Sequence, residues 1–428
     1  MAGLPWWQWV EGRGLVALTR IGPPRPRPRF LWTENVVPGI SPYRGYQKWF
    51  GNTLFCAPVP KYAPDSLPAD PYKAGRRLRA TSMETSTYWP TFNWNQYNLA
   101  THVVDTSKPE GPASEGGGGY TWQKVYQRFQ SEGFRIKRGG GTYQTMTDLV
   151  PLPINMYSAP GTDASASVLD SATFQCIDYW QMKMSDGTHK WADGSRTWNS
   201  ETNSYTYHDM IPAGSWGYIT CGKSPDTRVS NGAFPAYHGN VVASGFLGMA
   251  LQIGIDEALL AVGKKRLPDG TVVADPRGPV IDAIQHVIGI ELAIDVAEPG
   301  WSWPATFSDG YGAPPAEMKY GQRLYFDPAM VDLDDYAHPF LKALVWTGMV
   351  YGFYTTDRGG NFAFRCESLT PDFDQENVWW QNGPIFENAT YRNTIQAMPW
   401  DYLRSMPVDY GKPGTASAGA FIPMGIPS

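Results

Sequence analysis

Two carboxylates in the segment IDAIQHVIGIELAID, residues 281–295, are the first candidates for chemistry. Glu291 and Asp295 share one face of the period-two alternation that ends this segment, with Ala293 between them. Glycan-cleaving enzymes use two carboxyl groups as acid and base, about 5 to 9.5 Å apart. Because a strand rises about 3.4 Å per residue, these two lie roughly 13 Å apart and do not form such a pair by themselves.

Two interpretations of this strand face stay open. Laminarinase-like glycosidases, which fold as concanavalin-type sandwiches, carry a Glu-x-Asp-x-Glu or Glu-x-Asp-x-x-Glu pattern. The segment ELAID resembles that pattern only in part, because Ala293 occupies the place of the central Asp. The favoured interpretation is the solvated face of a half-buried strand. The alternative is a glycan hydrolase or lyase in which Glu291, Asp295 and Asp178 are catalytic.

The histidines and cysteines do not have the spacing of a metal site. The six histidines show no HxH or HExxH pattern, and the four cysteines include no CxxC pair. Cys176 and Cys366 lie in strand-like runs and are expected as buried thiols. No P-loop, GxSxG or GxGxxG before a helix is present, so neither a metal nor a cofactor is predicted.

Tryptophan is the other residue type that could bind a ligand. A sugar ring offers an apolar C–H face and a hydroxyl rim, which an aromatic platform beside carboxylates and amides matches. Most of the 18 tryptophans are expected to fill the core or a subunit contact, leaving two or three for binding. Eight of them lie in or beside loop-like stretches with Asp, Asn and Gln nearby: Trp180, Trp191, Trp198, Trp216, Trp301, Trp303, Trp379 and Trp380.

Composition indicates short strands joined by long loops. The 428 residues include 45 Gly, 37 Pro and 14% aromatic residues, which is rare in helix-rich folds. The net charge of -5 disfavours a nucleic-acid binder. No run of 18 apolar residues predicts a membrane-spanning helix, and the first residues show no pattern of a secretory signal.

Local patterns predict the elements that must position these residues. Residues 174–183 alternate as a strand, which the turn signal Asp186-Gly187 follows. Residues 120–136 predict a short amphipathic helix that ends near Gly133. Residues 255–262 predict a helix. The segment that begins at Pro339 predicts another, because proline suits a first helical turn. Residues 352–367, GFYTTD-RGG-NFAFRCE, predict a β-hairpin.

The two ends of the chain differ from its middle. Residues 1–45 carry Trp6, Trp7 and Trp9, followed by prolines that alternate with arginines, and they predict an extended arm whose tryptophans dock on a neighbour. Residues 46–390 are expected to form the β-sandwich body. Residues 391–428, rich in Pro, Gly, Ser and Ala, predict an extended tail or second docking arm.

Several short sequence blocks follow one another over about residues 145 to 370 in an order that other proteins share. They are LVPLPINMYSAPGTDASASVLDSATFQCIDYWQM, ASGF at 243–246, IQHVI at 284–288, SWPA with SDG at 302–310, YGQRLYFDPAMVDL, and LKALVWTGMVYGFYTTDRGGNFAF. This order resembles a group of mostly secreted bacterial proteins and a domain of minor tail proteins from tailed phages of actinobacteria. The resemblance implies a concanavalin-like β-sandwich. The chain departs from the secreted proteins by its excursion at 256–280, its lack of a signal pattern and its long arms at both ends, and these departures favour the phage proteins. The expected fold is therefore mainly β: a concanavalin-like or jelly-roll-like β-sandwich with one or two short helices and long extended arms.

The resemblance also implies a function. We expect a structural minor tail protein, at the tail tip or in adhesion, made in the host cytoplasm and carried in the virion. Its expected partners are other tail proteins, met through both arms in an oligomer, and host cell-wall glycan, with no nucleic acid and no membrane insertion. The expected glycan-binding residues are Asp178, Trp180, Trp303 and Arg323, with His286 in support. Two alternatives remain: a hydrolase or lyase of host cell-wall polysaccharide, and a purely structural baseplate or decoration subunit.

Overall fold

The computed structural model describes most of the chain from residue 50 onward, together with two short strands near the N-terminus. The described residues are 7–10, 14–17, 50, 53–59, 70–83, 90–94, 97–127, 131–132, 135–136, 144–145, 149–161, 163–184, 196–199, 204–207, 214–218, 220–224, 241–267, 269–293, 296–310, 318–368, 378–418 and 420–421. The fold is sheet-rich, and the described residues contain four α-helices and several separate sheets, none of them a barrel. The expectation of a mainly β protein is confirmed at this level.

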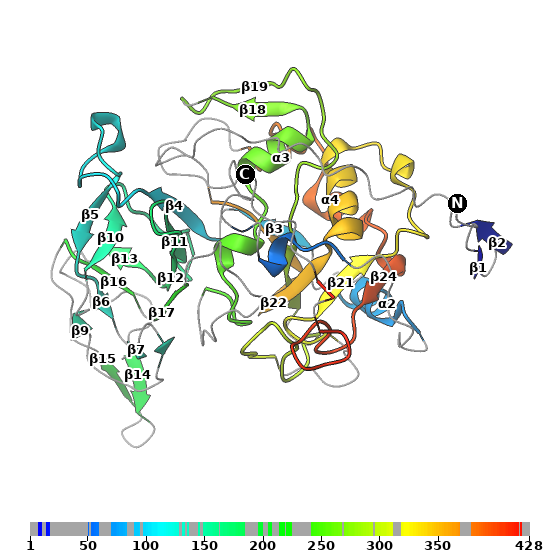
Figure 1. Ribbon diagram of the computed structural model, residues 1–428, viewed down its shortest axis with the longest axis horizontal. Helices are drawn as coiled ribbons and strands as arrows, with labels where there is room; N and C mark the ends of the chain where they lie inside the picture. The colour runs from blue at the N-terminus through cyan, green and yellow to red at the C-terminus, as the bar shows by residue number, and fades with distance from the viewer. Residues whose placement is uncertain are drawn as a thin grey trace.

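A six-stranded mixed sheet forms the centre of the larger half of the molecule (Figure 1). The strands β20 and β22 are parallel neighbours, and β20 is antiparallel to β23 on its other side. In spatial order the strands are β24 (Leu403–Ser405), β21 (Arg323–Phe326), β22 (Phe353–Gly359), β20 (Ile288–Ala293), β23 (Ala363–Arg365) and β3 (Thr91–Asn93).

Four helices accompany this sheet: α2 (Lys73–Leu78), α3 (Ile255–Ala261), α4 (Pro339–Val350) and α5 (Tyr391–Gln396). The longest, α4, begins at Pro339 as predicted and packs on β21. A side chain at Gly348 would lie 2.5 Å from the ring of Phe326, so glycine is what lets α4 approach the sheet this closely. No helix among the described residues is long and apolar enough to cross a membrane.

A four-stranded sheet joins the two halves of the molecule. Its order is β17 (Thr220–Lys223), β12 (Cys176–Trp180), β11 (Ala166–Asp170) and β4 (Ala100–Val104), and both faces are covered. Leu169 and Cys176 belong to the core of the larger half, whereas Val168 and Ile177 belong to a second core. Because successive side chains on a strand point to opposite faces, one sheet serves two hydrophobic cores.

The smaller half is built from short strands that pack on the second core. The pair β5 (Tyr120–Gln123) and β10 (Val150–Pro153) lies beside a four-stranded sheet of β13 (Lys183–Met184), β16 (Trp216–Tyr218), β6 (Tyr126–Gln127) and β9 (Gln144–Thr145). Isolated antiparallel pairs complete the described strands. They are β1 (Trp7–Val10) with β2 (Gly14–Ala17), β7 (Ser131–Glu132) with β8 (Arg135–Ile136), β14 (Arg196–Asn199) with β15 (Ser204–Tyr207), and β18 (Lys264–Arg266) with β19 (Val272–Ala274).

Three predicted elements are wrong. The helix expected over 120–136 is replaced by the strands β5 and β6. The hairpin expected over 352–367 does not form, because β20 lies between β22 and β23 and pairs with both. The extended tail expected from residue 391 does not form. Instead α5 packs on the body and β24 pairs with β21, so Trp400 and Leu403 are buried.

Candidate functional site

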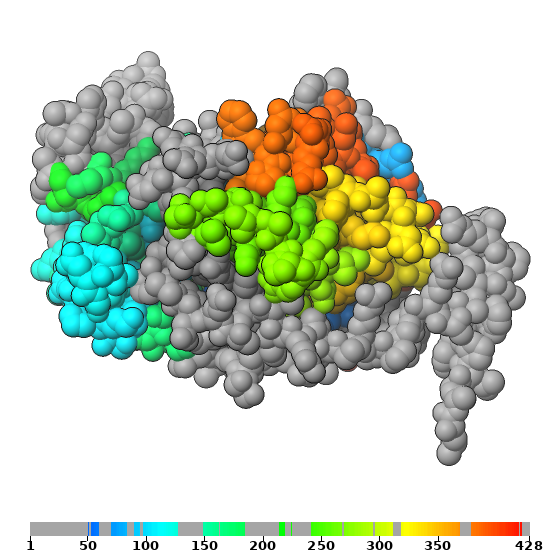
Figure 2. All heavy atoms as spheres, turned by 90° about the horizontal axis from the view of Figure 1, so that it is seen from above, coloured from blue at the N-terminus to red at the C-terminus, as the bar shows by residue number. Residues whose placement is uncertain are grey.

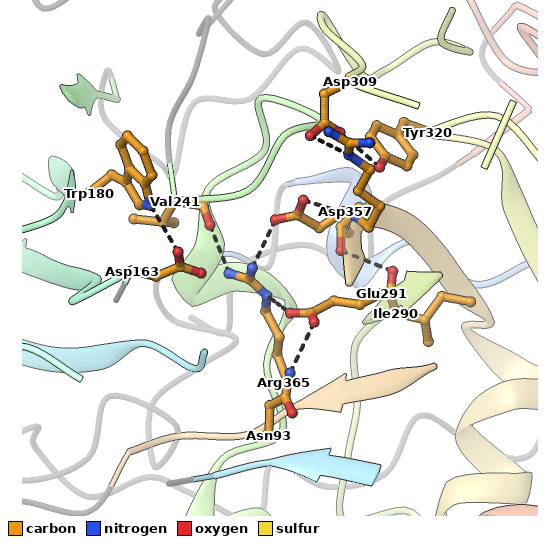
Figure 3. A network of polar contacts seen from close by, with 12 residues as sticks. Asn93, Asp163, Trp180, Val241, Ile290, Glu291, Asp309, Tyr320, Asp357 and Arg365 are labelled. Carbon is orange, nitrogen blue, oxygen red and sulfur yellow. Dashed lines mark hydrogen bonds and ion pairs between the residues drawn. The ribbon is translucent and has the colours of Figure 1, made fainter. Parts of the chain in front are cut away.

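A network of charged side chains surrounds Arg365 at one end of the central sheet (Figure 3). The Arg365 Nε donates to Glu291 Oε1 at 2.5 Å, and its Nη2 donates to Asp357 Oδ2 at 2.9 Å. Its Nη1 donates to the Val241 carbonyl oxygen at 2.8 Å, and the Asn93 amide donates to the second oxygen of Glu291 at 2.9 Å. We call Arg365, Glu291, Asp357 and Asn93 the Arg365 cluster.

Strand pairing brings the Arg365 cluster together. Glu291 on β20 and Asp357 on β22 are register partners, so two carboxylates that are 66 residues apart in the chain become neighbours. The register shifts between Ile290 and Glu291, directly before the pair of Glu291 and Asp357. Arg365 comes from β23 on the other side of β20, and Asn93 comes from β3 beside it. Four adjacent strands therefore each contribute one polar side chain.

More accessible polar groups border the Arg365 cluster. Asp309 accepts hydrogen bonds from Arg358 Nε and from the Tyr320 hydroxyl, both at 2.9 Å. The half-buried Trp180 directs its indole nitrogen at Asp163, 3.4 Å away, and this pair lies beside the Arg365 guanidinium (Figure 3). The half-buried aromatic ring and two partly exposed carboxylates form the polar surface next to the buried cluster.

Burial controls the electrostatics of the two clustered carboxylates. Desolvation raises the pKa of Glu291 above its usual range, and the charge of Arg365 opposes that shift. Desolvation also raises the pKa of Asp357, and the nearby charges of Glu291 and Asp309 raise it further. Arg365 is 3% exposed and bonded through all three guanidinium nitrogens. The cluster is therefore a network of buried ion pairs and hydrogen bonds among its own members.

The catalytic alternative does not fit this geometry. Both oxygens of Glu291 accept hydrogen bonds from the protein's own side chains, and Asp357 accepts from Arg365 and from the Arg358 backbone N–H. A catalytic acid and base need the substrate between them, whereas here a guanidinium lies between the carboxylates. Asp295, the expected partner of Glu291, lies outside the described residues. The favoured interpretation of a solvated strand face is also wrong, because Glu291 is only 5% exposed.

Asp178, expected to bind glycan, lies inside the molecule with no exposed surface. On the face of β12 that meets the larger half, it accepts the Gly248 backbone N–H at 2.8 Å and the Ser167 hydroxyl. Desolvation raises the pKa of Asp178 to about 6, and the hydrogen bonds from Ser167 and Gly248 oppose the shift. A direct sugar contact by Asp178 does not fit this position, and its carboxylate instead joins the shared sheet to the larger half.

His286 and Arg323 are also interior residues. His286 is 0% exposed, with Nε2 3.1 Å from Glu257 and Nδ1 2.8 Å from the Val287 carbonyl oxygen. Arg323 is 2% exposed, and its guanidinium donates to the backbone carbonyls of Leu54, Ala57 and Tyr351. Neither residue has a surface that a sugar could reach, so their expected glycan contacts are corrected to structural roles.

Rings complete the surroundings of Arg323, which lies 5.0 Å from the Tyr354 ring centroid and 4.8 Å from that of Phe421. Trp303 packs against the small core that contains Phe421, and its backbone N–H donates to Asp409 at 2.8 Å. Trp303 and Trp180 are both half-buried, so they are the expected glycan-binding residues that keep accessible surface. The structure does not bring these two together in one hydrogen-bonded network.

The remaining predicted residues have mixed outcomes. Trp6 lies outside the described residues, and of Trp7 and Trp9 only the backbone, in β1, is described, so their docking role stays a prediction. Cys176 and Cys366 are buried free thiols as expected. Among the described residues no group of three His, Cys, Asp or Glu is placed to hold a metal ion.

Arg365, the residue at the centre of the cluster, is not among the residues that the sequence patterns predict for a site. Arg365 stands between Phe364 and Cys366 in a strand-like apolar run. An arginine in such a run is almost never fully buried without a partner, so the run itself signals a buried carboxylate elsewhere. Nothing in the local pattern identifies that partner as Glu291 or Asp357.

Comparison of the chain with protein-family models, with curated proteins and with solved structures finds no match. The function must therefore be inferred from the residues and their geometry.

The raised pKa of Asp178 predicts a pH-dependent stability. A carboxyl group whose pKa is higher in the folded state than its ordinary 3.8 stabilises the fold most below that value, and the contribution is lost as pH rises through about 6. The shift corresponds to about 3 kcal/mol. In urea unfolding at pH 4.5 and pH 7.5, Asp178→Asn should show a weaker loss of stability at high pH than the wild type. Parallel pH profiles for the two proteins would contradict the shift.

Removing the central guanidinium should destabilise the fold strongly. Arg365→Met leaves two buried carboxylates without their cation, and we expect a loss of about 3 to 5 kcal/mol in the free energy of unfolding. The triple variant Arg365→Met, Glu291→Gln, Asp357→Asn should recover part of the loss because the charges are gone. The control is Arg76→Ala, which breaks an exposed ion pair with Asp70 and should cost less than about 1 kcal/mol. Equal losses in the free energy of unfolding for Arg365→Met and Arg76→Ala would contradict the stabilising role of Arg365.

Proposed function

We propose that the chain is a structural minor tail protein of a phage virion that contacts host cell-surface glycan and cleaves no bond. The observation that supports this best is the state of the carboxylates in the Arg365 cluster, which are bound to the protein's own donors. Together with the collinear blocks over residues 145 to 370, this favours a binding protein over a hydrolase or lyase.

The proposed glycan contact is the surface that Trp180 and Asp163 share. The indole of Trp180 is half-buried and hydrogen-bonds to the half-buried Asp163. An indole beside a carboxylate suits a sugar, whose C–H face packs on the ring while its hydroxyls donate to the oxygens. Asp309 and Arg358 offer further partly exposed polar groups near the Arg365 cluster, with side chains 34% and 26% exposed.

For the fold we propose a β-sandwich body of the concanavalin or jelly-roll type. The support is the packing of the pair β5–β10 on one face of the four-stranded sheet, with the second core between them. Four pairs among the described strands are parallel, namely β11–β4, β16–β6, β20–β22 and β23–β3. The strand topology of the proposed sandwich therefore differs from that of an all-antiparallel jelly roll.

The virion part of the proposal predicts where the protein is found. Antibodies against the purified chain should label one end of the tails of gradient-purified phage particles in electron microscopy. Mass spectrometry of the same particles should detect the chain at a constant ratio to the major tail protein. Its absence from washed particles that remain infectious would overturn the assignment.

The glycan part predicts binding without cleavage. The full chain should co-sediment with actinobacterial cell-wall polysaccharide, and no reducing ends or unsaturated sugars should accumulate over the incubation. Trp180→Ala should weaken binding roughly tenfold, as expected for a central aromatic contact. The matched control is Trp380→Ala, because Trp380 is 58% exposed and is not part of the contact proposed for Trp180 and Asp163. Release of sugar ends that Glu291→Gln abolishes would replace this proposal with the hydrolase.

A further inference from the structure

The pair of strands β5 and β10 presents an apolar outer face. Trp122 is 40% exposed, Leu149 is 53% exposed and Ile154 is 41% exposed. These are three of the nine large hydrophobic side chains that are exposed among the described residues, and all three come from this pair or its immediate ends. Scattered single exposures are normal, whereas a local concentration marks an interaction surface.

Register places Trp122, Pro151 and Leu149 on one side of the pair, whereas Ile154 follows the buried Leu152 by two residues and continues the opposite face. Trp122 is the cross-strand partner of Pro151, so the indole and the half-buried proline ring share a face. The ring of Tyr120, 5.4 Å away at 82°, supports the indole edge to face. We call Trp122, Leu149 and Pro151 the Trp122 ribbon.

Acidic side chains lie beside the Trp122 ribbon. The exposed Glu110 accepts the Trp122 backbone N–H through Oε2 at 3.1 Å, which fixes a carboxylate next to the indole. In the loop that holds it, Lys108 pairs with Asp105 at 3.4 Å, which leaves Glu110 and the exposed Glu115 as a surplus of negative charge. Figure 2 shows this part of the chain, in cyan, at the surface of one end of the molecule.

The chain itself carries a segment with matching chemistry. Residues 22–29 read GPPRPRPR, with three arginines and no acidic residue. Proline spacing of this kind favours a polyproline II helix of three residues per turn, about 3.1 Å per residue. Pro23, Pro26 and Arg29 then fall on one edge, so two proline rings and one cation follow in line.

We propose that the Trp122 ribbon is the docking site for residues 22–29 of a second copy of this chain. The proline rings pack on Trp122 and Pro151, and the Arg29 guanidinium pairs with Glu110. Aromatic surfaces bind preformed polyproline helices well because the helix loses little entropy on binding. Lys124, exposed at the far end of β5, opposes the reverse orientation of the arm. The proposal stands independently of the virion assignment.

The arrangement of the ends favours a second copy over the same chain. In Figure 1 the N-terminal strands β1 and β2 lie at the opposite end of the molecule from β5 and β10. An arm that reaches a neighbour makes a head-to-tail contact, which leaves one copy with a free ribbon and the other with a free arm. Such contacts propagate into open chains or closed rings.

Binding of the isolated segment is the first test. A fluorescent peptide of residues 21–32 should bind the full chain, and excess unlabelled peptide should compete. Trp122→Ala should weaken binding by roughly tenfold or more, as for a central aromatic contact. Glu110→Gln keeps the acceptor for the Trp122 N–H, so its loss of affinity should be smaller and should vanish at high salt. Trp380→Ala is the control and should bind like the wild type.

Mixing of two defective full-length chains tests the second copy. Wild type should self-associate with rising concentration in sedimentation experiments. The variant Trp122→Ala and the arm variant Pro23→Ala, Pro26→Ala, Arg29→Ala should each remain monomeric. Because one keeps the arm and the other keeps the ribbon, their mixture should form a one-to-one dimer.

Three outcomes would overturn the proposal. Peptide binding that survives Trp122→Ala would place the site elsewhere. A monomeric wild type that binds the peptide only after its own arm is altered would show docking within one chain. A ribbon that binds cell-wall polysaccharide but not the peptide would make Trp122 a sugar contact.

Discussion

The buried guanidinium of Arg365 is the interaction on which the centre of this structure depends. It joins β23 to β20 through Glu291, to β22 through Asp357, and to the segment at Val241 through a carbonyl oxygen. In water each of these groups would be hydrated, and in the interior each would be costly alone. Arg365 reaches both carboxylates because β22, β20 and β23 are adjacent, so the ion pairs and this strand order stabilise each other.

The same principle joins the shared four-stranded sheet to the larger half. Asp178 on β12 accepts the backbone N–H of Gly248. Glu367 accepts the Thr101 hydroxyl from β4 and the backbone N–H of Ile255 at the start of α3. Buried carboxylates thus connect the two halves at two points. Within the larger half, Arg323 joins the segments at Leu54 and Tyr351 through their carbonyl oxygens and lies against the Phe421 ring. Acidic residues that the sequence suggests as catalytic or binding residues therefore make structural contacts between elements.

Sequence patterns predicted two of the helices but not the helix-like segment at 120–136, which forms strands, and they predicted the long-range pairings poorly. The helix that begins at Pro339 and the helix from Ile255 follow from proline position and apolar spacing, which are local signals. The insertion of β20 between β22 and β23 is not a local property, and it broke the expected hairpin. The tail was misjudged because its Gly and Pro content outweighed Trp400 and Leu403, whose apolar side chains fill the core. The resembling blocks and sugar-matching residue types gave Asp178, His286 and Arg323 as ligand contacts, and neither signal contains the burial of these side chains.

A crystal structure of the full chain tests the central claim most directly, through the contacts of Arg365. The account predicts that electron density will place its guanidinium within hydrogen-bond distance of both Glu291 and Asp357, with no ordered water between those carboxylates. An Arg365 side chain turned away, with the two carboxyl groups facing each other across ordered water about 5 to 9.5 Å apart, would contradict it and restore the glycosidase.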